Sequence, residues 1–196
     1  MSDFDSTFRR FSEAVVYGTL RSVWGVKVTG LERVPRSGPL IVAFNHTSLV
    51  DGPLLCVTIA SARRPRFLGK QELFQIPAVG WFLRAIGMLP LQRGAADHSA
   101  MRAALEILEG SGSIGLAPEG TRVKPGETRP PKPGVGFLAA KAGAWVQPVR
   151  LIGASRFPRA FPLEVRFGSP LPPPTGEGRE AASSYARSVM DAIYAL

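Results

Sequence analysis

The sequence predicts an α/β fold: a single domain with a mixed, largely parallel β-sheet flanked by helices. The chain has 196 residues, a length that suits one domain with a proper hydrophobic core. Hydrophobic residues make up 45% and charged residues 20% of it, as in ordinary globular proteins. Short apolar runs rich in β-branched residues alternate with stretches of helical periodicity, and this alternation is typical of helices packed on a largely parallel sheet.

The first expected element is an amphipathic helix over residues 7–24. Apolar side chains recur there at helical spacing, with arginines and a glutamate between them. Two interpretations stay open for this helix. It packs on the core of its own domain, or it lies at a membrane interface, where an apolar face with basic and aromatic flanks is the usual signature.

The alternation then continues to the end of the chain. Strands are expected at residues 26–28, 40–44, 66–68, 88–91, 114–117, 146–152 and 163–167. Helices are expected at residues 52–62, 79–86, 97–109, 135–142 and 177–195. Two proline-rich stretches, 121–133 and 169–178, interrupt the pattern and are expected to be irregular. In this class of fold the loops at strand ends carry the chemistry.

The charge and the composition narrow the classes of partner. The net charge of +9 indicates an anionic partner. The basic residues are scattered and form no long block, so nucleic acid is not expected. One cysteine and two histidines argue against a disulfide within the chain and against a zinc site. No apolar run reaches the ~18 residues of a membrane span, and the start lacks a secretory pattern, so a cytosolic protein is expected.

A histidine and an aspartate stand five residues apart where the strand at 40–44 ends. His46 and Asp51 could meet across one turn. A neutral imidazole can accept a proton from an alcohol, while a carboxylate on its other nitrogen fixes the tautomer and stabilises the imidazolium that forms. Taken alone, the pair is also explained by structural roles: a polar residue at a strand end, and an N-cap for the helix expected from residue 52.

A second polar motif, at residues 118–122, makes the sequence resemble a particular protein family. Asn45-His46, four residues and Asp51 are followed about seventy residues later by Pro118-Glu119-Gly120-Thr121-Arg122. This pair of motifs resembles the glycerolipid acyltransferase family, which includes the 1-acylglycerol-3-phosphate acyltransferases. The segment 69–80 with Gly87 and Arg93 is similar to the family's second block, and residues 146–149 to its fourth. The four blocks cover about half the chain, and the ends of the chain add nothing to the match.

The resemblance implies an O-acyltransferase of phospholipid biosynthesis. A fatty acyl group would pass from acyl-CoA or acyl-carrier protein, as co-substrate, to the free hydroxyl of 1-acylglycerol-3-phosphate. His46 would act as the general base and Asp51 would orient it, with no acyl-enzyme, no metal and no further cofactor. Residues 1–25 would be the amphipathic helix and candidate membrane-interface segment, and residues 26–196 the acyltransferase domain.

The resemblance also implies a site for the acceptor phosphate. Arg93, Glu119, Gly120 and Arg122 correspond to residues that hold or position it, with Lys70 as a weaker candidate. Guanidinium groups suit phosphate oxygens. A carboxylate does not, so Glu119 is expected to fix Arg122 or another cation through an ion pair.

Two departures from the family's pattern leave the acceptor open. Ala117 stands where the family often has a bulky residue, and Val123 stands where it often has serine, so one hydrogen bond to substrate is in doubt. One alternative is therefore the same chemistry on another lysophospholipid or a lyso-aminolipid. A separate alternative is a non-catalytic basic lipid-binding module. The partners expected are the acyl donor, a lysophospholipid and an anionic membrane surface. The location expected is cytoplasmic, peripherally attached to the inner face of the cell membrane.

Overall fold

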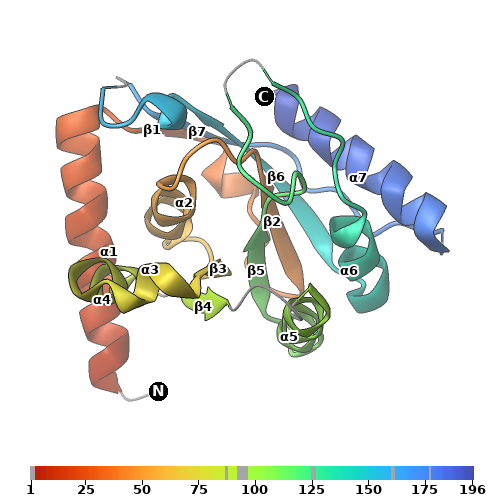
Figure 1. Ribbon diagram of the computed structural model, residues 1–196, viewed down its shortest axis with the longest axis horizontal. Coiled ribbons are helices and arrows are strands. Elements are labelled where there is room, and N and C mark those ends of the chain that lie inside the picture. The colour runs from red at the N-terminus through yellow and green to blue at the C-terminus, as the bar shows by residue number, and fades with distance from the viewer. Residues whose placement is uncertain (1–2, 87, 92–96, 125–126, 160–161, 177) are drawn as a thin grey trace.

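The computed structural model describes residues 3–86, 88–91, 97–124, 127–159, 162–176 and 178–196. Within these ranges a seven-stranded sheet runs through the centre of one α/β domain, with helices on both of its faces (Figure 1). The α/β fold class predicted from the sequence is confirmed.

The sheet is mixed and largely parallel. Its strands are β1 (Lys27–Thr29), β2 (Leu40–Phe44), β3 (Arg66–Lys70), β4 (Leu89–Leu91), β5 (Ser113–Leu116), β6 (Trp145–Ile152) and β7 (Glu164–Phe167). They lie in the order β1-β7-β6-β2-β5-β3-β4. Of these neighbours only β6 and β7 pair antiparallel within the described residues. Each strand expected from the sequence is present, with ends that shift by at most two residues.

The helices are also close to those expected. They are α1 (Asp3–Trp24), α2 (Asp51–Ile59), α3 (Gln71–Gln75), α4 (Pro77–Ala85), α5 (Asp97–Glu109), α6 (Gly134–Ala142) and α7 (Gly178–Tyr194), with 3-10 turns at Leu31–Arg33 and Ala154–Arg156. Helix α1 begins four residues earlier than predicted and α2 ends three residues earlier. Helix α3 was not predicted, because five residues are too few to show a helical period.

Strand β2 is the centre of the core. Its five residues, Leu-Ile-Val-Ala-Phe, are all buried, as expected for a parallel strand covered on both faces. Leu40, Val42 and Phe44 pack on one face with α2 and α4, whereas Ile41 and Ala43 pack on the other with α5, α6 and α7. The carboxyl end of β2 is therefore a rigid place from which to project side chains.

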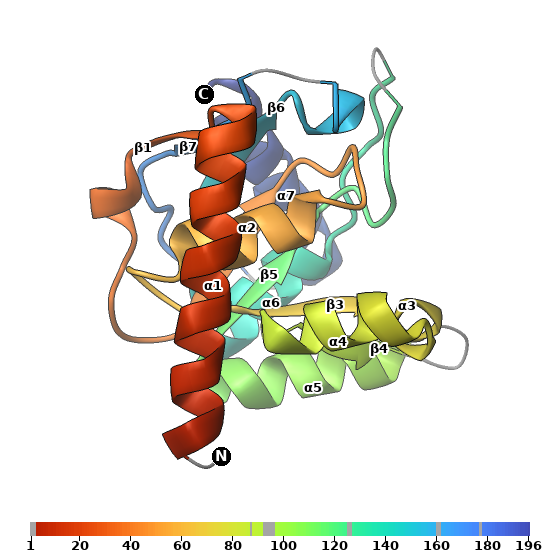
Figure 2. The same cartoon turned by 90° about the vertical axis from the view of Figure 1, so that its left-hand side faces the viewer.

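Helix α1 crosses the α2 side of the domain (Figure 2). Val16, Tyr17, Leu20 and Trp24 pack against the core on that face. The buried carboxylate of Glu13 pairs with Arg9 of the same helix at 2.8 Å and with Arg64, which follows α2, at 3.1 Å. The second ion pair attaches α1 to the rest of the domain. Other apolar residues of α1 are exposed, so the helix both packs on the core and presents a second apolar face to solvent.

Candidate active site

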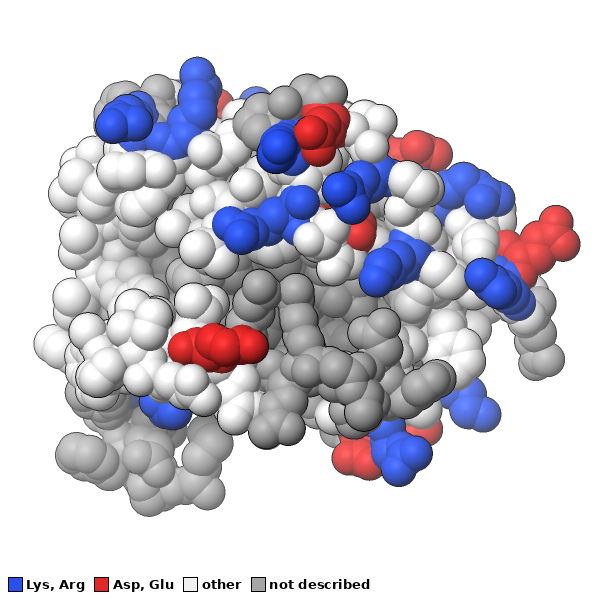
Figure 3. Space-filling model, in the orientation of Figure 1, with Lys and Arg blue, Asp and Glu red and all other residues white. Residues whose placement is uncertain are grey.

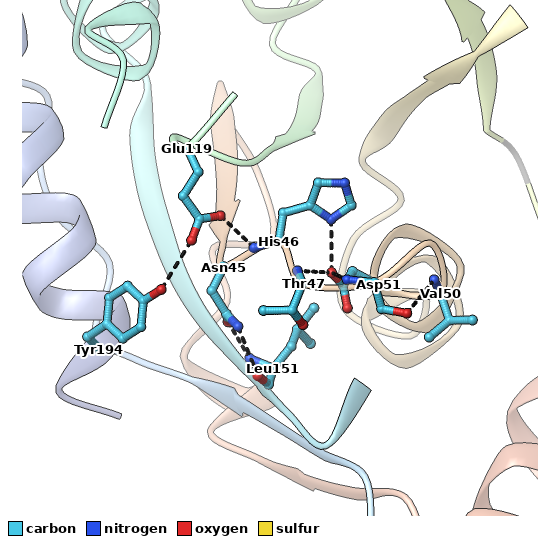
Figure 4. A network of polar contacts seen from close by, with 9 residues as sticks. Asn45, His46, Thr47, Val50, Asp51, Glu119, Leu151 and Tyr194 are labelled. Carbon is cyan, nitrogen blue, oxygen red and sulfur yellow. Dashed lines mark hydrogen bonds and ion pairs between the residues drawn. The ribbon is translucent and has the colours of Figure 1, made fainter. Parts of the chain in front are cut away.

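The structure brings His46 and Asp51 together at the carboxyl end of β2. His46 Nδ1 lies 2.9 Å from Asp51 Oδ2 (Figure 4). The same oxygen accepts the backbone N–H groups of Thr47 and Ser48, each at 2.7 Å. The turn after β2 thus wraps around one carboxylate oxygen, and these charge-assisted bonds fix its position. Asp51 is fully buried.

The capping role considered for Asp51 is wrong. Helix α2 begins at Asp51, and the residue before it, Val50, occupies the N-cap position without a side-chain bond. The Asp51 carboxylate bonds to the preceding turn and to His46, as described above. Its place in the first helical turn favours the negative charge electrostatically.

The free side of the His46 ring faces outward. Because the Asp51 carboxylate accepts only, the ring proton is assigned to Nδ1, and Nε2 carries the lone pair. Nε2 has no hydrogen bond to any residue that the structure describes. The side chain is 26% exposed, and Phe44 contacts its ring edge-on. This is the arrangement a general base requires.

Asn45 anchors the end of β2 to the neighbouring strand β6. Its Nδ2 donates to the Leu151 carbonyl at 3.0 Å, and its Oδ1 accepts the Leu151 N–H at 2.7 Å. The side chain is 2% exposed, so both bonds lie in the interior. The sequence shows Asn45 only as part of a motif, and only the folded structure shows the strand that it binds.

The second motif folds into a turn against the first. Residues 118–122 follow β5, which lies beside β2. Val123 N–H donates to the His46 carbonyl at 2.8 Å. Gly120 has φ +70°, and a Cβ there would lie 2.6 Å from Cε of Lys132, so a side chain would meet both strain and crowding. Glu119, Gly120 and Arg122 are therefore beside the dyad.

The ion pair expected between Glu119 and Arg122 is wrong. Glu119 is 3% exposed, and its carboxylate faces inward, where Oε2 accepts the His46 N–H at 2.6 Å and Oε1 accepts the Tyr194 hydroxyl at 3.1 Å. Among the residues whose side chains the structure describes, no cation lies within 4.0 Å of it, and the side chains of Lys70 and Arg93 are outside that set. Arg122 is exposed. Burial raises the pKa of the Glu119 carboxyl, and the bonds from His46 and Tyr194 oppose that rise.

The structure adds three residues that the sequence did not single out. Tyr194, in the last turn of α7, reaches Glu119. The Arg150 guanidinium carbon lies 4.1 Å from the centroid of the Tyr194 ring. Lys132, from the proline-rich loop, lies over Gly120. No local pattern marked Tyr194 or Arg150, because the contacts of each are with residues far away in the chain.

The last two residues expected at the phosphate site are only partly described. Lys70 ends β3 at the same edge of the sheet, but its side chain is outside the described part of the structure. Arg93 lies outside the described residues altogether.

Basic side chains gather over the loop between β5 and α6 (Figure 3). The exposed cations of this loop are Arg122, Lys124, Arg129 and Lys132. Glu127 is the one exposed acidic residue in the part of the loop that the structure describes. The surface beside His46 is therefore positively charged, which favours an anionic substrate.

Two other features lie apart from this site. Cys56 is buried within α2, and burial raises the pKa of its thiol, so it is inert as a nucleophile. A cavity of about 470 Å³, lined partly by Arg63, Arg64 and Arg66, lies at the opposite edge of the sheet, where β3 and β5 begin. Arg63 donates to the Gly38 carbonyl and Arg64 pairs with Glu13, so two of its cations are already engaged.

The fold and the site define an α/β protein with a His–Asp pair and a basic turn at one edge of its sheet. Residues 25–152 match the sequence profile of the Acyltransferase family. The match covers more than half of the chain, and the chain belongs to this family. Its recognition as a glycerolipid acyltransferase from two sequence motifs is thereby confirmed.

Individual relatives agree with this assignment. The chain is 31% identical over 132 residues to the chloroplastic 1-acyl-sn-glycerol-3-phosphate acyltransferase BAT2 of Brassica napus, covering 66% of this chain and 38% of that protein. It is 32% identical over 156 residues to the 1-acyl-sn-glycerol-3-phosphate acyltransferase of Borreliella burgdorferi, covering 76% and 60%. The chain thus spans less than two thirds of the length of either relative.

A solved structure shares the whole fold. The crystal structure of PlsC, the 1-acyl-sn-glycerophosphate (LPA) acyltransferase from Thermotoga maritima, superposes with a TM-score of 0.77 at 26% sequence identity. The superposition covers 100% of this chain and 82% of that one. The similarity therefore extends to the N-terminal and C-terminal helices, beyond the region that carries the motifs.

Proposed function

We propose that this chain transfers a fatty acyl group from a thioester to the free hydroxyl of 1-acylglycerol-3-phosphate. The observation that carries the proposal is the His46–Asp51 contact of 2.9 Å beside the basic turn at Arg122. The names of the relatives support the same reaction. The donor is the thioester of CoA or of acyl-carrier protein, whose phosphate groups suit the positive surface.

The geometry supports direct transfer. His46 Nε2 takes the proton of the acceptor hydroxyl while the oxygen of that hydroxyl attacks the thioester carbonyl carbon. The carbon–sulfur bond then breaks, and the thiolate leaves and is protonated by the imidazolium. The negatively charged Asp51 carboxylate stabilises that imidazolium, since it already accepts a hydrogen bond from the Nδ1–H of the ring. The buried Cys56 supports a mechanism without an acyl-enzyme on sulfur.

Arg122 is proposed to bind the acceptor phosphate. It is exposed beside the dyad and makes no ion pair within 4.0 Å in the described part of the chain, so its guanidinium is available. Charge-assisted bonds to phosphate contribute about 1.5–3 kcal/mol each. By the resemblance, Arg93, Glu119 and Gly120 hold or position the phosphate with it, and Lys70 is a weaker candidate. The bond from the His46 N–H to Glu119 supports an indirect part for Glu119, through the backbone of His46.

The function is tested by following thiol release from a long-chain acyl-CoA in the presence of lysophosphatidic acid. Wild type should turn over, and Arg122→Ala should raise the KM for lysophosphatidic acid by about tenfold or more, with a smaller change in kcat. Arg179→Ala, which removes an exposed arginine at the far end of α7, is the matched control and should change neither constant.

Other acceptors and donors separate the alternatives. Thiol release with another lysophospholipid or a lyso-aminolipid, and none with lysophosphatidic acid, would change the acceptor and keep the chemistry. The same panel is run with an acyl-carrier-protein donor. Failure of every combination would leave the non-catalytic lipid-binding module.

We also propose that the apolar face formed by α1 and α4 rests on an anionic membrane. Helix α4 packs beside α1, and exposed apolar side chains come from both helices. They are Phe11, Val15 and Val23 of α1, Ile76 immediately before α4, and Val79 and Trp81 within α4. Exposed Arg10 and Arg21 flank them on α1. An apolar face with basic flanks is typical of interfacial helices. None of the described helices is both long enough and apolar enough to cross a membrane.

Vesicle sedimentation tests this membrane contact. The protein should sediment with vesicles of phosphatidylglycerol and phosphatidylcholine, and Phe11→Asp with Trp81→Asp should lower the bound fraction severalfold, because apolar area is lost and repulsive charge is added. Phe137→Asp is the control, since Phe137 is 51% exposed on α6, on the other side of the sheet. Equal binding of all variants would refute the proposed face.

A further inference from the structure

We infer that Tyr194 is a positioning residue for His46, acting through Glu119. The inference rests on the proposed function, because it assigns Tyr194 a part in the work of the same histidine. Tyr194 lies in the C-terminal helix, outside both sequence motifs and outside the stretch that matches the family profile. It contacts no reacting atom in the proposed mechanism, so its effect must pass through the residues that it holds.

A continuous chain of hydrogen bonds joins Tyr194 to the backbone of His46 (Figure 4). The Tyr194 hydroxyl donates to Glu119 Oε1 at 3.1 Å, and Glu119 Oε2 accepts the His46 N–H at 2.6 Å. Both carboxylate oxygens are therefore engaged, each by one donor. Two donors on opposite oxygens determine the orientation of the carboxylate, and a buried oxygen that loses its donor is costly.

His46 is held on both of its backbone polar groups from the loop that follows β5. Its N–H is bound by Glu119, and its carbonyl accepts the N–H of Val123 at 2.8 Å. The ring is fixed separately by Asp51. Glu119 therefore controls where the peptide before the imidazole sits, whereas Asp51 controls how the ring turns.

Tyr194 is itself held in place. The preceding residue, Ile193, is fully buried and anchors the last turn of α7 to the core. Arg150 of β6 lies over the Tyr194 ring at 4.1 Å, a cation–π contact. The next residue of β6, Leu151, carries the two bonds to Asn45, the neighbour of His46. Two consecutive residues of strand β6 therefore contribute to this arrangement: Arg150 contacts the Tyr194 ring, and Leu151 binds the side chain of Asn45.

Removal of the Tyr194 hydroxyl should slow the chemical step and leave substrate binding intact. Without that donor the Glu119 carboxylate is free to turn, and its bond to the His46 N–H weakens. A small displacement of Nε2 lowers the fraction of complexes in which the base reaches the acceptor hydroxyl. The phosphate contacts proposed for Arg122 do not depend on this bond, so they should persist.

The test compares two tyrosines of one helix. Tyr194→Phe should lower kcat about fivefold to tenfold, with the KM of both substrates changed less than about twofold. Tyr185→Phe is the matched control: it also removes a hydroxyl bond from α7, donated to the Pro172 carbonyl at 2.7 Å, and should leave kcat unchanged. In proton–nitrogen correlation spectra the His46 amide should shift in Tyr194→Phe and stay in place in Tyr185→Phe.

A second variant shows whether the tyrosine acts through Glu119. In a Glu119→Ala background, Tyr194→Phe should cost no further rate, since the group that transmits its effect is gone. An additional fivefold loss there, or equal rates for Tyr194→Phe and Tyr185→Phe, would overturn the inference. His46→Ala in the same assay keeps the two ideas apart. If His46→Ala is inactive, either of those two results refutes only the role of Tyr194. If His46→Ala is fully active, the proposed function is refuted, and the inference about Tyr194 with it.

Discussion

Replacement of His46 by alanine should lower kcat for thiol release by about a thousandfold, within the range that a positioned general base contributes. In the proposed mechanism Nε2 is the group that accepts the hydroxyl proton, and Nδ1 already binds Asp51 at 2.9 Å. Without the imidazole the alcohol would have to attack with its proton in place. Acceptor binding through Arg122 should survive, so the KM for lysophosphatidic acid should change little.

The controls for His46→Ala separate loss of the base from loss of the fold. The side chain is partly exposed and its ring makes one hydrogen bond within the described residues, so the thermal midpoint should fall by only a few degrees. His98→Ala removes the other histidine of the sequence and should keep wild-type turnover. A His46→Ala protein that is folded and retains more than about a tenth of the wild-type rate would exclude His46 as the base.

Asp51→Asn should be at least as damaging as His46→Ala, with a loss in kcat of about a thousandfold to ten-thousandfold, as expected when the carboxylate partner of a catalytic histidine becomes an amide. Oδ2 of Asp51 accepts three N–H donors, from His46, Thr47 and Ser48. An amide oxygen in that place carries no charge to stabilise the imidazolium, and an amide nitrogen there would face the donors. The tautomer with a free Nε2 is then no longer favoured.

The prediction for Asp51→Asn is tested by measuring both kcat and the thermal midpoint of unfolding. Asp191→Asn makes the same change at an exposed position of α7 and should alter neither quantity. Since the buried Oδ1 of Asp51 has no hydrogen-bond partner among the described residues, loss of the charge also removes a desolvation penalty, and the stability loss should be small beside the loss of rate. Turnover of Asp51→Asn within about threefold of wild type would rule out the proposed orienting role.

The positions of the helices and strands could be read from the sequence because local pattern decides them. The run Leu40–Phe44 is apolar throughout, and a strand buried on both faces needs that composition. Helix α5 matches its prediction at both ends, since thirteen residues display several helical turns. The short helix α3 was missed for the opposite reason.

The site was predicted in part. His46 and Asp51 are joined by a single turn, so their spacing along the chain already implied that they could meet. The predicted pairing of Glu119 with Arg122 was wrong, because Arg122, the nearest cation in the sequence, turns to solvent while the carboxylate turns inward. Charge sign along a turn does not specify which side chains face the core.

By itself, the sequence determined the fold class, the order of the elements, the dyad residues and the family, since each depends on neighbouring residues or on a motif. Only the tertiary structure decided that Glu119 binds the His46 backbone and that Tyr194 and Arg150 stand behind it. These contacts join residues that are far apart in the chain, 73 positions for His46 with Glu119 and 75 for Glu119 with Tyr194. Such pairs meet because β5, β6 and α7 pack beside β2, and that packing follows from the whole core and not from any single segment.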